Sequence, residues 1–273
     1  MESTIEAGTL ETRRDAYENP NDWLNALVQK RLAQAAKDEE TLPVEMAWVA
    51  KRDHAVYQKR FKPLVIAFIA AGIFGVAQSP SVLALLVAFV AMYFYIDFYG
   101  GVLHVVLDHP GFVAVPGLDV PCVEFQWHHT YAYDIATRSI LDVWGDLNPL
   151  LLIKSVCLFA VFGFEPTAMM VAGVGYFWGY ANQFAHRLAH TAPRKRPAFG
   201  RWLEERGILI SPERHQAHHQ NYDESFPVLA GHAAPLIQAM LRVVPNRWAW
   251  LVLFVVLTAV DLIALTALLH TIV

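Results

Sequence analysis

Five apolar runs follow one another along the chain, separated either by short polar breaks or by long polar loops. They cover residues 64–77, 82–107, 150–164, 167–184 and 248–273. Because about 20 apolar residues in a helix cross the hydrocarbon core of a bilayer, the pattern predicts an all-α integral membrane bundle of four or five transmembrane helices. The breaks at Gln78–Ser81 and Glu165–Pro166 are short, so the first four runs are expected to form two helical hairpins.

Charge divides the chain into a polar beginning and an apolar body. Hydrophobic residues make up 55% and charged residues 17%, and 21 of the 46 charged residues lie within the first 62 positions. This composition excludes disordered, collagen-like and coiled-coil classes. We therefore predict a charged, partly helical, cytoplasmic N-terminal segment over residues 1–60, a membrane domain over 61–247, and a further transmembrane helix over 248–273.

The basic residues orient the predicted bundle. Ten of the 21 Lys and Arg residues precede residue 63, nine follow residue 185, and neither short break carries one. By the positive-inside rule, the N-terminus and the long loops 108–148 and 186–247 face the cytoplasm. No eukaryotic targeting signal is visible, which favours a bacterial inner membrane over the endoplasmic reticulum. A net charge of −4 gives no reason to expect a nucleic-acid partner.

Histidine is the unusual residue type, with 12 copies, eight of which belong to four clusters. His104 lies at the cytoplasmic end of the second apolar run, and His186 and His190 lie at the end of the fourth. The cytoplasmic loops contain one pair, His128-His129, and one triplet, His215-x-x-His218-His219. The predicted topology places all four clusters on one membrane face, although they are far apart in sequence.

The spacing within these clusters is that of metal ligands on helices. Residues three or four apart share a helix face, as do His186 and His190, or His104 and Asp108. Neutral imidazole is the commonest metal ligand in proteins, and iron accepts both imidazole and carboxylate. One tetrahedral zinc ion cannot use eight histidines, whereas two six-coordinate ions with positions open for oxygen can. The predicted metal-binding and catalytic set is His104, Asp108, His128, His129, His186, His190, His215, His218 and His219.

Plainer interpretations exist for individual residues. A single interfacial histidine usually reaches toward water, and one HxxxH pair can cap a helix; only the convergence of four clusters favours a metal site. Asp97 lies two helical turns before His104 and either orients it or makes a helix–helix polar contact. Two further residues are candidates for supporting the metal ligands: Asn182, one turn before His186, and His232, in a loop. His54 and His270 are interpreted as structural.

The motifs Asp97–His104–Asp108, His128-His129, Asn-Gln-x-x-His-x-x-x-His at 182–190 and His-x-x-His-His at 215–219 together resemble the Kua family of membrane lipid desaturases. That family includes plasmanylethanolamine desaturase, bacterial CarF-type relatives and a plant plastid desaturase of phosphatidylglycerol acyl chains. The resemblance covers roughly residues 60–240, so the apolar segment 248–273 is extra to it. The stretch after His129 and the stretch 231–234 differ from the family's pattern. The resemblance therefore supports the metal chemistry more strongly than the identity of the substrate.

The resemblance implies a membrane oxidoreductase with a cytoplasmic helical cap carrying a His-rich di-iron site. Such an enzyme uses O2 and two electrons to introduce a double bond into a lipid alkyl or acyl chain. The formation of a plasmalogen vinyl ether from plasmanylethanolamine is one such reaction. The electrons come from an external cytochrome, ferredoxin or reductase, because this sequence carries no GxGxxG after a strand and no haem motif. Two alternatives stay open: a lipid hydroxylase on the same site, and a non-enzymatic metal-binding or metal-transport protein.

Overall fold

The computed structural model describes residues 62–109, 111–112, 115–130, 132, 134–221, 224 and 226–272. The predicted N-terminal segment, residues 1–60, lies outside the described residues. The chain divides into two compact units. The described part of the first unit comes from Leu107–Tyr131, and the second unit comprises Tyr57–Val106 and Ala132–Val273.

Every regular element in the described part of the chain is helical, which confirms the predicted all-α class. The first unit contributes α5 (Asp119–Thr130). The second unit contains a helix over Lys62–Ala77, α4 (Val82–Leu107), α6 (Asp134–Thr137), α7 (Ile140–Gly145), α8 (Asn148–Phe162), α9 (Pro166–Ala189), the 3-10 turn η2 (Pro193–Lys195), α10 (Ala198–Glu205), α11 (Pro212–Gln220), α12 (Ala234–Val243) and α13 (Arg247–His270).

The five predicted apolar runs each coincide with a helix, and local capping explains where one helix of a pair begins. The carboxylate of Glu165 accepts hydrogen bonds from the backbone N–H groups of Thr167 and Ala168, and Pro166 occupies the first turn of α9. Two helices, α4 and α13, are long and apolar enough to cross a membrane by length and composition. The total of four or five spans stays a prediction.

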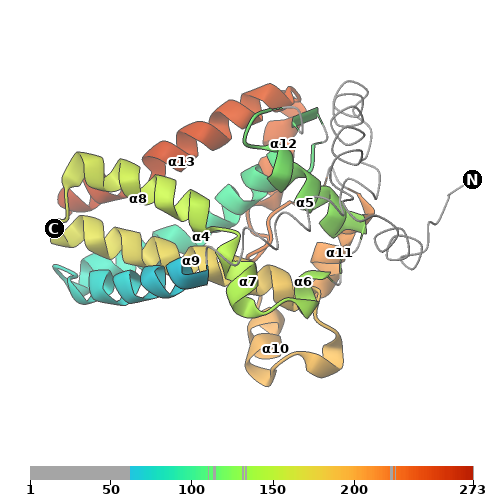
Figure 1. Cartoon of the computed structure of the whole chain (residues 1–273), viewed down its shortest axis with the longest axis horizontal. Helices are drawn as coiled ribbons and strands as arrows, with labels where there is room; N and C mark the ends of the chain where they lie inside the picture. The colour runs from blue at the N-terminus through green and yellow to red at the C-terminus, as the bar shows by residue number, and fades with distance from the viewer. Residues whose placement is uncertain are drawn as a thin grey trace, which may run out of the picture. The chain divides into compact units, whose positions relative to one another are not determined.

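Small residues allow the helices of the second unit to approach closely. A Cβ atom placed on Gly173 of α9 would lie 2.5 Å from the carbonyl oxygen of Gly72, so only glycine fits there. Figure 1 shows α8 and α9 running side by side with α13 against them. Their shared core includes Leu158, Met170 and Leu262, all of which are fully or almost fully buried.

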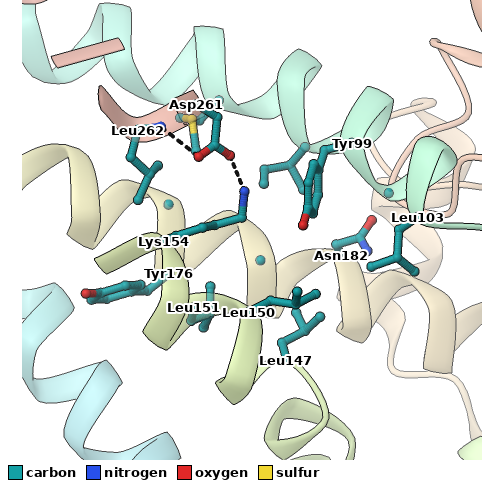
Figure 2. Close-up of a pocket in the computed structure, with 15 residues that line it drawn as sticks. Tyr99, Leu103, Leu147, Leu150, Leu151, Lys154, Tyr176, Asn182, Asp261 and Leu262 are labelled. Carbon is teal, nitrogen blue, oxygen red and sulfur yellow. Dashed lines mark hydrogen bonds and ion pairs between the residues drawn. The ribbon is translucent and has the colours of Figure 1, made fainter. Parts of the chain in front are cut away.

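A buried ion pair joins two of these helices. The ammonium group of Lys154 in α8 binds the carboxylate of Asp261 in α13, and each side chain is almost entirely buried (Figure 2). The Lys154 Nζ atom also lies 3.8 Å from the centre of the Tyr99 ring in α4. Since an isolated charge in an apolar interior is costly, each partner requires the other.

We expect removal of one partner alone to destabilise the bundle more than removal of both. Lys154→Met leaves the Asp261 carboxylate buried without its cation, which costs roughly 3–5 kcal/mol of unfolding free energy. The double variant Lys154→Met/Asp261→Leu has no buried charge left, and its stability should recover to within about 1–2 kcal/mol of the wild type. Thermal unfolding of the detergent-solubilised protein measures all three. Additive losses in the double variant would show that the two charges are not coupled.

Candidate metal centre

Six histidines of the second unit come from three helices that are far apart in sequence. His104 is in the last turn of α4, and His186 and His190 are at the end of α9. The other three are on α11, which begins where the Ser211 hydroxyl accepts the N–H of Arg214 and Pro212 occupies the first turn. At positions i, i+3 and i+4 of this short helix, they share one face: His215, His218 and His219.

Four of these side chains converge on one point. His186, His190, His215 and His219 each present a ligand atom, and these atoms lie within 4.8 Å of one another. The Nε2 atom of His215 lies 2.7 Å from Nε2 of His190 and 3.1 Å from Nε2 of His219. Three imidazole nitrogens therefore face one another within the distance of a single hydrogen bond.

This geometry fits a shared cation. Two nitrogens bound at about 2.1 Å to one ion in adjacent 90° positions lie about 3.0 Å apart, close to the distances seen here. Burial, and then the proximity of His186, His190 and the other rings, holds the pKa of His215 well below its ordinary value. The ring is therefore neutral at physiological pH, which is the state that binds a metal.

A second pair of imidazoles lies beside this group. The rings of His104 and His218 have centroids 5.2 Å apart, and both side chains are buried. The Nδ1 atom of His218 is 2.8 Å from the backbone carbonyl of Glu224. Because a carbonyl oxygen can only accept, Nδ1 carries the proton and Nε2 presents its lone pair as a ligand atom.

The first unit holds three more predicted ligands. The Nε2 atom of His129, in α5, lies 2.8 Å from the Asp108 carboxylate, and both side chains are almost fully buried. The ring of His128 lies 5.9 Å from that of His129, centroid to centroid. A histidine held by a carboxylate in this way has a defined tautomer and orientation.

Two charged side chains position α11 against α4 through one loop. The Asp97 carboxylate, fully buried in α4, accepts hydrogen bonds of 2.8–2.9 Å from the backbone N–H groups of Ala230, Gly231 and Ala233. From the other side, the Arg214 guanidinium of α11 donates to the carbonyls of Ala230 and Gly231, at 3.3 Å each. These hydrogen bonds of Asp97 go to the loop, whereas the sequence pattern suggested a contact with His104 or with another helix.

Asn182, which the sequence suggested as a partner of His186, borders a small cavity beside the ligand-bearing turns. The cavity lies between α4, α8, α9 and α13, and its walls include Leu103 and Asn182 together with the Lys154–Asp261 pair (Figure 2). Its volume is about 30 Å³, enough for one or two water molecules. A lipid chain can therefore enter here only if side chains or helices move.

The third candidate, His232, is exposed and lies away from both imidazole groups of the second unit. Its ring packs near Tyr93 and Phe94, with centroids 6.1 and 6.2 Å apart. Tyr93 is eleven residues before His104, or about 16 Å along the helix. The sequence pattern does not predict the Lys154–Asp261 pair, although two opposite charges inside apolar runs are a signal of such a pair. The role of Arg214 in holding the loop had no sequence signal.

The loop contact of Asp97 has a measurable consequence. Asp97→Asn replaces one acceptor oxygen with an NH2 group facing backbone N–H donors, so the free energy of unfolding should fall by about 1–3 kcal/mol. The metal content of the folded fraction should stay that of the wild type, because the remaining oxygen of Asn still accepts from two of the three loop N–H groups and keeps the loop between α4 and α11. Chemical unfolding and metal analysis of the same preparation measure both. Lost metal at unchanged stability would instead assign Asp97 to orienting His104.

The chain is similar to known lipid desaturases. A family model described as a lipid desaturase domain matches residues 93–267. The chain is 23% identical to fatty acid desaturase 4-like 1 of Arabidopsis thaliana, a chloroplast protein, over 76% of this chain and 69% of that protein. It is 25% identical to the chloroplast fatty acid desaturase 4 of the same plant, over 52% of this chain and 44% of that protein. No solved structure matches the chain.

Proposed function

Because the chain belongs to the lipid desaturase domain family, we propose that it is an O2-dependent, di-iron oxidoreductase that introduces a double bond into a lipid hydrocarbon chain. The observation that carries the proposal is the group of four converging imidazoles, of which His186 and His190 lie at the end of the apolar helix α9 and His215 and His219 on the short helix α11. Two apolar helices and the desaturase relatives also indicate membrane association.

The donor set is suited to two iron ions. His186, His190, His215 and His219 would hold one ion, and His104 and His218 would contribute to the second. The nitrogen spacings near 3 Å favour the 90° angles of a six-coordinate ion over a tetrahedral ion, whose ligand nitrogens lie about 3.4 Å apart. Asp108, His128 and His129 enter the proposed ligand set from the sequence prediction.

The protein's own part is to position a chain and exclude water. When bound, the iron pair supplies the oxidant that removes two hydrogens from neighbouring carbons, with O2 and two external electrons as co-reactants. The ligand histidines of the second unit are mostly buried, so bulk water has little access to the reacting position. The clamped loop between Asp97 and Arg214 holds α11 in register with α4 and so keeps the two ligand groups in place.

The substrate class and the cellular setting are part of the proposal. The names of the relatives make a fatty acyl chain the first substrate to test, and the alkyl chain of plasmanylethanolamine, suggested by the sequence resemblance, is the second. We propose a cytoplasmic His-rich face because of the distribution of basic residues, and a bacterial inner membrane because no eukaryotic targeting signal is visible. An external cytochrome, ferredoxin or reductase would deliver the electrons there.

Metal analysis tests the centre directly. We expect the purified protein to carry about two iron ions per chain. His186→Ala and His215→Ala should each lose metal and lower the activity by more than about 100-fold. Loss of a residue that only orients a ligand typically costs about 10–100-fold, and loss of a ligand itself should cost more. The matched control is His270→Ala, since His270 pairs with Glu165 at 3.4 Å and stands apart from both ligand groups. Full activity without bound transition metal would refute the di-iron proposal.

Lipid mass spectrometry identifies the reaction. A host that expresses the wild-type chain should accumulate a lipid about 2 mass units lighter than its precursor, because desaturation removes two hydrogens. A host expressing His215→Ala should not accumulate it. A product about 16 mass units heavier would establish hydroxylation on the same site instead. Fragmentation then places the new double bond in an acyl or an ether-linked chain.

A further inference from the structure

The helix α10 and the turn before it lie against the end of α9, outside the ligand groups. Gly200 faces α9 so closely that a Cβ atom there would lie 2.7 Å from the Leu188 side chain. A partly buried Leu203 packs on the same side. An ion pair of 3.0 Å between Arg196 and Glu204 ties the preceding turn to the helix. The buried face of α10, which includes Gly200 and Leu203, therefore packs against the rest of the second unit.

A different edge of α10 presents two aromatic rings to the surroundings. Phe199 is 67% exposed and Trp202 is 44% exposed. Their rings stack with centroids 6.0 Å apart, and they form one apolar patch three residues apart on the helix. The guanidinium of Arg206 lies 5.4 Å from the centre of the Trp202 ring. The patch therefore has a cation at its border.

Basic residues dominate the segment around this patch. Residues 193–206 contain five cations and two carboxylates, and one carboxylate, Glu204, is engaged by Arg196. The remaining cations are exposed: Arg194, Lys195, Arg201 and Arg206. Exposed aromatic rings beside exposed cations match the interface of a bilayer, where rings sit at the headgroup level and cations meet lipid phosphates.

The position of α10 fits this interpretation. Figure 1 shows α10 beyond the end of α9 that carries His186 and His190, and to one side of the helices that run alongside α9. If those helices span a membrane, that place is level with the headgroups next to the bundle. We propose that α10, through Phe199 and Trp202, inserts into the headgroup boundary and that its flanking cations bind anionic lipids.

A bilayer explains the patch better than an acidic protein does. A protein partner would use the charges but would not by itself require the rings to point away from the bundle. The outer faces of α4 and α9 are themselves apolar, with Phe94 55% and Phe177 53% exposed, and a bilayer around the bundle would cover these rings as well. Leu188, on which α10 rests, lies between His186 and His190, so insertion would also hold that turn of α9 at a defined depth.

Depth measurements on the full chain in nanodiscs test the proposal. A nitroxide is attached at Phe199→Cys or, as the matched control on the exposed charged edge of the same helix, at Glu205→Cys, with Cys122 and Cys157 replaced by alanine. In nanodiscs containing phosphatidylglycerol, we expect the label at 199 to collide more with O2 than with a water-soluble nickel chelate. The label at 205 should show the reverse order. Equal, water-like accessibility at both positions would overturn the proposal.

Charge variants separate the bilayer from a protein partner. Neutralising Arg194, Lys195 and Arg201 with glutamine should lower the ratio of inserted to free label, roughly fivefold for each residue, in anionic nanodiscs. In phosphatidylcholine nanodiscs the same variants should have little effect, because no anionic headgroup is present. If position 199 stays exposed to water in both bilayers and becomes protected only when an acidic ferredoxin is added, the surface is a protein-docking site and the lipid assignment is wrong.

Discussion

The packing of several buried imidazoles against one another is the constraint on which the second unit depends. Protonation of two or more of these rings would place like charges a few ångströms apart in a poorly hydrated environment. The group as a whole therefore cannot be protonated, whereas a shared cation can be held between the rings. The 2.7 Å and 3.1 Å separations from His215 are those of ligands around one ion, and the neutral state of His215 keeps its lone pair available.

The surrounding polar contacts make sense as supports for that arrangement. α11 is only nine residues long and could not hold three histidines in place by its own stability. The loop 230–233 connects it to α4 because Asp97 uses the donors of this loop and Arg214 its acceptors. The other ligand-bearing helix, α9, is held against the helix Lys62–Ala77 by a glycine contact that lets the two backbones approach closely.

The Lys154–Asp261 pair shows that a charge buried in an apolar helix bundle needs an opposite charge beside it. Two charges within apolar helices are tolerated because they neutralise each other, and the Tyr99 ring covers the cation. The pair lies at the cavity that also reaches Asn182 and Leu103, near the ligand-bearing turns. It links α8 to α13, which the family match includes as far as residue 267.

The sequence by itself determined the helical class, the positions of the five apolar helices and the types of side chain at the candidate site. Hydrophobic runs, capping residues such as Glu165 and histidine spacing are local signals, and they operate within one or two helical turns. Only the tertiary structure decided which side chains meet. It joined Lys154 to Asp261 across 107 residues and directed Asp97 to the backbone of a loop 133–136 residues away. It also placed His232 on Tyr93 and Phe94. Such contacts depend on how helices rotate and pack against one another, which periodicity along one helix does not specify.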